Sequence, residues 1–201
     1  TKIDEITGNI ATLKAAGIAL GELATIESPG KSTLGQVIRL NQDNVTVQVF
    51  GGTKGISTSD RVRFLGHPMM AKYGNSLLGR IFNGSGVPID GGPEPQEEDI
   101  AIGGPSFNPA NRIIPKQMIR TNIPMIDVFN SLVVSQKLPI FSIPGEPYNQ
   151  LLARVGMQAE ADIIILGGMG LKFDDFTFFR RTFEESGVMN RVIMFIHLAS
   201  D

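Results

Sequence analysis

The stretch Phe141-Ser-Ile-Pro-Gly-Glu-Pro-Tyr-Asn-Gln150 decides the fold class of the C-terminal part of this chain of 201 residues. Residues 137–142, which run into this stretch, predict a buried β-strand, and a helical pattern begins near Asn149. A strand, a Gly/Pro turn and a helix in this order surround the phosphate-binding loop of nucleotide-binding α/β domains. We therefore expect the architecture of a nucleotide site at this turn.

The residues with which such a loop binds phosphate are replaced in this chain. A working loop has Gly, four residues and then Gly-Lys-Ser/Thr, because backbone N–H groups surround the phosphates while the Lys reaches the outer ones. The equivalent positions hold Ser142, then Pro147, Tyr148 and Asn149, and Gly145 remains inside the loop. The sequence therefore predicts a degenerate loop made of Gly145, Pro147, Tyr148 and Asn149.

Two substitutions act directly against phosphate binding. Pro147 has no backbone N–H to donate. Glu146 adds a negative charge, and at about 4 Å with an effective dielectric constant near 20 it repels a phosphate charge by about 4 kcal/mol. We expect no catalytic residue in this chain and weak or no nucleotide binding. An ordinary strand-to-helix turn without a ligand and a shared role at a subunit interface both stay open.

The rest of the C-terminal part alternates between strand and helix patterns. The predicted order is strand, helix, strand, helix, strand, at residues 137–142, 149–160, 162–166, 173–186 and 191–198. We expect two right-handed crossovers of a parallel sheet, with the strand at 162–166 covered on both faces and ended by glycines 167, 168 and 170. Three parallel strands cannot cover themselves well, so an incomplete domain is expected.

The helical patterns also predict which side chains face the core. In the first helix these are Leu151, Leu152, Val155 and Ala159. In the second they are Phe176, Phe179 and Phe183.

Residues 1–75 have the pattern of an all-β domain. Apolar and polar residues alternate strictly over 45–49, and a turn at 41–44 joins this strand to another at 36–40. Further short strands are predicted at 6–13, 22–28 and 61–65. Short strands at close spacing favour a small closed β-barrel, because closure removes exposed sheet edges.

Residues 76–201 form the second predicted domain, which begins with a Pro/Gly-rich linker to about residue 120. A strand is expected at 77–82, and the linker includes Pro105, Pro109 and Pro115. A short helix is then predicted over 125–132, with Thr121 or Asn122 as its cap.

Composition excludes several classes of function. The net charge of −2 comes without a basic stripe, so no nucleic-acid partner is expected. The chain has no Cys, and His67 and His197 lack neighbours at ligand spacing, so no metal site is expected. Asp174 and Asp175 are explained by the start of a helix. No apolar run approaches the roughly 18 residues of a spanning helix.

Several segments resemble the B subunits of the V-type (A/V-type) ATP synthases, in the form found in spirochaetes and chlamydiae. They are Gly66-His-Pro-Met-Met-Ala-Lys-Tyr-Gly, Leu78-Gly-Arg-Ile-Phe-Asn-Gly-Ser-Gly-Val-Pro-Ile-Asp-Gly-Gly-Pro, Phe107-Asn-Pro, Gln136-Lys-Leu-Pro-Ile-Phe-Ser, and residues 119–122, 126–127 and 195–201. The resemblance implies an N-terminal β-barrel followed by a RecA-like P-loop-type domain, truncated at Asp201. Tyr148 stands where the family usually has His, and Glu146 is also a departure.

The resemblance also implies a function. It is that of a non-catalytic, regulatory subunit that alternates with the A subunit in a hexameric ring and contacts central-stalk and peripheral-stalk subunits. ATP or ADP with Mg would lie at the interface between the A and B subunits, coupled to proton or sodium transport. The expected location is cytoplasmic, on the inner membrane only through the complex. The alternatives are a catalytic F-type or secretion-type ATPase subunit and a Rho-like, barrel-based nucleic-acid binder.

Overall fold

The computed structural model describes residues 1–103 and 108–200, so Pro105, Phe107 and Asp201 of the predicted linker and motifs lie outside it. The chain divides into two compact units. The first holds Thr1–Ala71 and the segment that begins at Asp99, and the second holds Lys72–Glu98 and the remainder. The chain changes unit within the paired strands β7 (Met70–Tyr73) and β9 (Glu98–Ala101). The domain limits at 75 and 76 stay a prediction.

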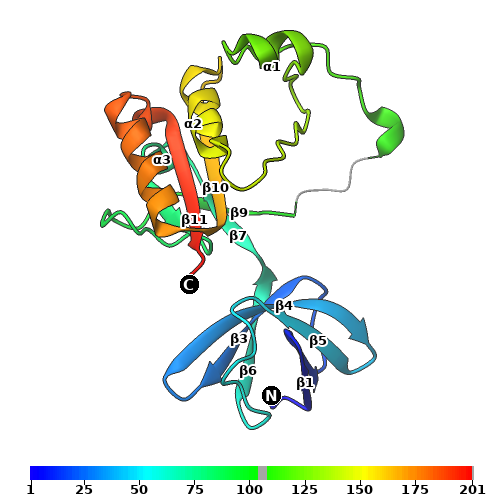
Figure 1. Cartoon of the computed structure of the whole chain (residues 1–201). Coiled ribbons are helices and arrows are strands. Elements are labelled where there is room, and N and C mark those ends of the chain that lie inside the picture. Colours follow the sequence, from blue (N-terminus) through cyan, green and yellow to red (C-terminus); the bar gives the residue numbers. More distant parts are fainter. Residues whose placement is uncertain (104–107, 201) are drawn as a thin grey trace. The chain divides into compact units, whose positions relative to one another are not determined.

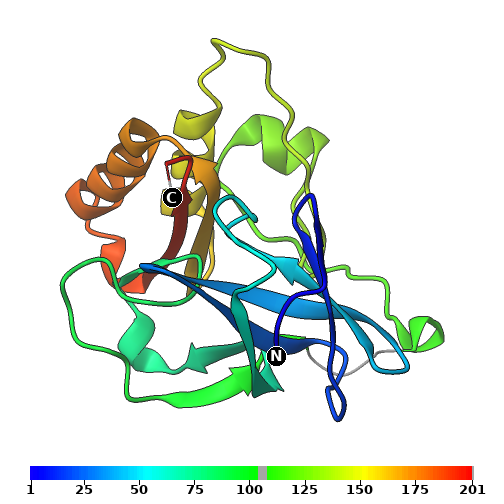
Figure 2. The ribbon, with the colours of Figure 1, turned by 90° about the horizontal axis from the view of Figure 1, so that it is seen from below.

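The first unit is an antiparallel six-stranded sheet, drawn from blue to cyan in Figures 1 and 2. Its strands, in the order β1-β2-β5-β4-β3-β6, are β1 (Glu5–Thr7), β2 (Ile10–Lys14), β5 (Asn44–Val49), β4 (Lys31–Asn41), β3 (Glu22–Ser28) and β6 (Arg61–Pro68). The strand expected over 6–13 is a hairpin, because Gly8 takes a positive φ of 58° and turns the chain.

The alternation predicted for 45–49 holds in space. Val45, Val47 and Val49 are buried in one apolar core, while Thr46 and Gln48 are not. The predicted turn between β4 and β5 is also present, with Asn41 paired to Asn44. These residues confirm the all-β first unit.

Full closure of the barrel is not formed. The two ends of the sheet are β1 and β6, and no ladder joins them. One isolated bridge, Lys2 to Arg61, is supported by the Val62 N–H, which donates to the Thr1 carbonyl at 2.7 Å. The strand β1 is three residues long and pairs with β2 alone, so it adds no ladder to β6.

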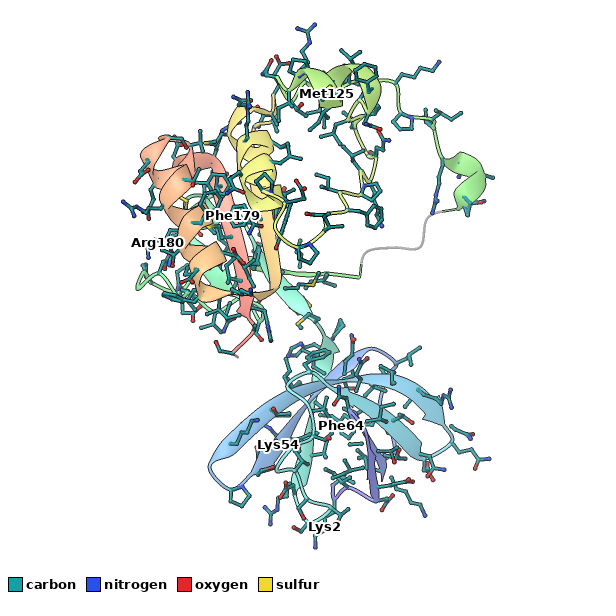
Figure 3. All side chains as sticks on the ribbon, viewed as in Figure 1. Lys2, Lys54, Phe64, Met125, Phe179 and Arg180 are labelled. Carbon is teal, nitrogen blue, oxygen red and sulfur yellow. The ribbon has the colours of Figure 1, made fainter. Side chains whose placement is uncertain are left out.

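The second unit contains a three-stranded parallel sheet with two helices on one face (Figures 1 and 2). Its order is β10 (Ile164–Leu171), β11 (Val192–Leu198), β8 (Ile81–Asn83), and the helices are α2 (Tyr148–Gln158) and α3 (Phe173–Glu185). In α3, Phe179 and Phe183 are buried as predicted and Phe176 is partly buried. Figure 3 shows Phe179 pointing toward the sheet and Arg180 pointing away from it.

The predicted core face of α2 is partly wrong. Ala159 is buried as expected, but Leu152 is exposed, and the α2 side chains in the core are Ala153 and Met157. This face is selected by the close approach of α3. A Cβ added at Gly156 would lie 3.3 Å from the Phe183 ring.

The strand predicted at 137–142 is absent, and the third strand of the sheet is β8 from the predicted linker. None of the strands in the described residues pairs with 137–142, and the Phe141 side chain is 92% exposed. An extended segment without a ladder partner leaves its backbone groups to water, so apolar content alone does not make it a strand.

The strand β10 also differs from its prediction at its end and on its outer face. It continues through Gly167 and Gly168 to Leu171, with a shift of register between Met169 and Leu171 where Gly170 has a φ of 64°. One face of β10 is uncovered: Ile165 is 67% and Met169 92% exposed.

The helix expected at 125–132 is the shorter α1 (Pro124–Phe129). Neither Thr121 nor Asn122 caps it, because its N-cap is Ile123, without a side-chain bond. The Asp127 carboxylate instead accepts from the Thr121 hydroxyl (2.7 Å) and from the backbone N–H groups of Thr121 and Asn122. These bonds, the Thr121 hydroxyl first, lower the pKa of Asp127. The described chain also contains three short 3₁₀ helices, at Asn75–Leu77, Pro109–Asn111 and Met189–Arg191.

An ion pair fixes the loop that follows β8. Arg80 donates to Asp90 through Nε (2.6 Å) and Nη2 (2.9 Å), and Asp90 also accepts from the N–H groups of Ile81 and Gly92. The Arg80 and Asp90 side chains are only 17% and 15% exposed. The hydrogen bonds from Arg80 hold the pKa of Asp90 well below its ordinary range.

We predict that Asp90→Asn lowers the free energy of unfolding of the second unit by about 2 kcal/mol at pH 7, because Arg80 loses its charged partner. A lowered folded-state pKa stabilises fully above the ordinary Asp value of about 3.9, and this stabilisation declines as pH falls below it. The deficit of the variant should therefore shrink only below about pH 4.

Tyrosine fluorescence during urea unfolding measures this effect, since both tyrosines of the chain, Tyr73 and Tyr148, belong to the second unit. Glu184→Gln is the matched control, because its pair with Arg180 is about half exposed and should contribute less than about 0.5 kcal/mol. Equal effects of the two variants would contradict the assignment.

Candidate functional site

The degenerate loop, residues 143–147, uses its own backbone donors. The Glu146 N–H donates to the Ile143 carbonyl at 3.2 Å, and Gly145 takes a φ of 96° inside this turn. The Tyr148 N–H donates to the Glu146 carbonyl at 2.9 Å. Pro147 is the N-cap residue of α2 and makes no side-chain cap bond. Two amides at the loop are thus used within it, and a third position has no amide proton.

The four predicted loop residues lie together. Gly145, Pro147, Tyr148 and Asn149 all line one pocket of about 570 Å³. The two amide groups already bonded within the loop, at Glu146 and Tyr148, cannot donate to a ligand without breaking the turn. The loop therefore leads into the start of a helix, as a phosphate-binding loop does, but two of its amides are already bonded.

The same pocket brings in charges from the start of α3. Lys172, Asp174 and Asp175 line it together with Glu146, which makes three carboxylates against one ammonium group. Such a charge balance opposes a phosphate and favours a cationic group. Sequence reasoning assigned Asp174 and Asp175 to the start of a helix only. It could not place them beside the loop, because the loop and α3 are separated in the chain by α2 and β10.

One hydrogen bond joins the two helix starts. The Asn149 side-chain Nδ2 donates to the Asp175 carboxylate at 2.8 Å in a partly buried contact. Each residue is in the first turn of its helix, where the Asp175 charge also interacts favourably with the helix dipole. The bond therefore fixes the width of the pocket between α2 and α3.

Tyr148, which the sequence frame sets against the lysine of a working loop, lines three pockets around the loop. It lines the charged pocket, a smaller pocket of about 310 Å³ against the glycines of β10, and an apolar pocket of about 650 Å³. Its phenol presents an aromatic face where the loop of an ATP-binding protein presents an ammonium group.

The described part of the chain contains neither a cluster of metal ligands nor a helix that could cross a membrane. No three His, Asp or Glu side chains there gather at distances that would hold a metal ion. The His67 Nδ1 lies 2.8 Å from the neighbouring Pro68 carbonyl oxygen, and His197 lies exposed on β11. Over residues 1–103 and 108–200, no helix has the length and hydropathy needed to cross a membrane.

Comparison with protein families gives two matches in chain order. Residues 3–66 match the β-barrel domain of the ATP synthase alpha/beta family, and residues 122–201 match the nucleotide-binding domain of the same family.

Curated relatives agree with this order. The chain is 56% identical over 201 residues to the V-type ATP synthase beta chain of Borreliella afzelii and 57% over 200 residues to V-type ATP synthase beta chain 1 of Treponema pallidum. It is 54% identical to the beta chain of Protochlamydia amoebophila. All of this chain is aligned in each case, but only 46% of each relative, so the chain spans about half their length.

A solved structure has the same fold. The assembled ATPase EscN of the type III secretion system of enteropathogenic E. coli superposes with a TM-score of 0.82 at 22% identity, over 99% of this chain and 48% of that one. At this identity the likeness concerns the fold alone.

We predict that Asn149→Ala destabilises the second unit by about 1 kcal/mol, because the bond to Asp175 is lost. Asn149→Asp should cost more at pH 7, since two carboxylates at this distance repel and raise each other's pKa. That extra loss should be recovered as pH falls toward 5, when one carboxyl takes up a proton. Thermal unfolding at pH 5 and pH 8 measures it, and a pH-independent difference between the two variants would contradict the geometry.

Proposed function

This chain belongs to the ATP synthase alpha/beta family, and we propose that it acts as a non-catalytic, regulatory B subunit in the head of a rotary V-type ATP synthase. The observation that carries the proposal is the loop at 143–148. It leads into the start of α2, its Glu146 and Tyr148 amides are bonded within the turn, and it carries Tyr148 where a working loop carries a lysine.

In this proposal, the fold is kept because the ring needs a subunit of this shape. A ring of six similar positions requires a neighbour of matching shape at each one, even where that neighbour does no chemistry. We propose an alternating ring with a catalytic A subunit, in which ATP or ADP with Mg is held mainly by that neighbour and this chain forms one wall of the site. Central-stalk and peripheral-stalk subunits complete the partners.

The location and coupling follow from the same proposal. The head of the complex lies at the cytoplasmic side of the inner membrane, and this chain reaches the membrane only through the complex. Proton or sodium transport takes place in other subunits. The relatives named V-type ATP synthase beta chain support this assignment.

A catalytic subunit, F-type or secretion-type, is the second candidate. The likeness to EscN gives it a common fold and nothing beyond that. Phosphoryl transfer needs a cation on the outer phosphates, and Tyr148 offers none. A Rho-like binder of nucleic acid fits less well, because the net charge is −2.

We predict that the chain binds ATP·Mg with a Kd weaker than about 1 mM in calorimetry. Combined Glu146→Gly, Pro147→Gly and Tyr148→Lys substitutions remove one repulsive charge and restore a donor and a cation, so they should tighten binding by about tenfold or more. Glu185→Gln, which changes the same charge at the other end of α3, is the control and should have no effect. Micromolar binding by the unaltered chain would contradict the proposal.

A second prediction concerns assembly. The full-length protein, mixed with the A subunit of the same complex, should form an alternating hexamer that size-exclusion chromatography and native mass spectrometry detect. The isolated protein should show no ATP turnover, because the loop lacks its cation. A protein that stays monomeric beside its expected catalytic partner, or that hydrolyses ATP alone, would overturn the assignment.

A further inference from the structure

An apolar groove lies along the degenerate loop. It has a volume of about 650 Å³ and is lined mainly by Ile140, Phe141, Ile143, Pro147, Tyr148 and Leu151. Phe141, Ile143 and Tyr148 are exposed, although each is large and apolar or aromatic. Exposed apolar side chains gathered in one groove are typical of an interaction surface or a ligand-binding groove.

The groove is continuous with the charged pocket. The two share Glu146, Pro147 and Tyr148 as lining residues, so they meet along the loop. In the charged pocket, the carboxylates of Glu146, Asp174 and Asp175 exceed the single ammonium of Lys172 by two charges. An occupant of both must therefore be apolar at one end and cationic at the other.

We propose that this groove, the loop groove, is the docking site for a segment of a neighbouring protein chain that presents an apolar side chain next to an arginine. The inference rests on the proposed function, which places another protein chain beside this one. The apolar side chain packs against Phe141, Ile143 and Leu151, and the guanidinium enters the charged pocket between Glu146 and Asp174.

Arginine fits the pocket better than lysine. Its planar guanidinium stacks on aromatic faces and pairs with carboxylates through several N–H groups, and the pocket offers Tyr148 and Phe178 beside Glu146 and Asp174. Asp175 is already bonded to Asn149, so it adds charge but fewer free acceptor positions. Lys172 offsets one of the three carboxylate charges, so an entering guanidinium still meets an excess of two negative charges.

The negative charge of the pocket also disfavours anionic occupants. A nucleotide, a nucleic acid or an anionic lipid surface would bring negative charge to three carboxylates. A basic and apolar protein segment instead gains from both halves of the groove, and arginine and aromatic contacts are those that dominate protein interfaces.

The test is an NMR titration of the ¹⁵N-labelled chain with N-acetyl-Phe-Arg-amide. We expect millimolar binding, with shifts at Glu146, Tyr148 and Asp174 that weaken as salt rises from about 0.05 to about 0.5 M, a range over which exposed charges become screened. The double variant Glu146→Gln with Asp174→Asn should weaken binding by about fivefold, as expected for two rim ion pairs. Glu185→Gln is the matched control on α3 and should leave the Kd unchanged.

Three outcomes would overturn the inference. The first is equal binding of N-acetyl-Phe-Gln-amide, which lacks the charge. The second is unchanged affinity in the double variant, with its fold verified by circular dichroism. The third is displacement of the dipeptide by ATP at equal concentration. An alternating ring that assembles while the dipeptide fails to bind would remove this inference alone, whereas dipeptide binding without ring assembly would remove the proposed function alone.

Discussion

The contact between Gly156 of α2 and the ring of Phe183 of α3 is the constraint on which the second unit depends. With no side chain at Gly156, the two helices approach closely on one face of β10 and β11, and a Cβ there would lie 3.3 Å from the ring. This approach brings the first turns of the helices together. The Asn149–Asp175 bond and the charged pocket both follow from it.

The loop leads into a helix as a phosphate-binding loop does, but it lacks the groups that bind phosphate. A phosphate-binding loop works because its backbone donors point at the ligand and are not used elsewhere. Here the donors of Glu146 and Tyr148 are bonded within the turn, Pro147 has none, and carboxylates surround the place of the phosphates. The position that binds a nucleotide in a working loop becomes, in our proposal, a surface that receives a neighbouring protein.

Much of this was predictable from local pattern. The alternation at 45–49, the phenylalanines of α3 and the altered loop residues all follow from period and residue type. The failures that concern strands have one cause. The segment 137–142, the outer face of β10 and the closure of the first sheet each depend on what lies beside a strand, and sequence pattern describes the strand but not its neighbour.

The sequence by itself determined the class of each unit, the family resemblance and the loss of the loop's lysine and of one N–H, because these depend on residue identity. Tertiary structure alone decided that β8 pairs with β11, that Asn149 bonds Asp175, and that Glu146 shares a pocket with Asp174. These are contacts between segments far apart in the chain, set by the packing of α2 against α3 and of the strands against one another. A sequence period describes only positions that are close in the chain. It therefore does not predict these contacts, which depend on how distant segments pack.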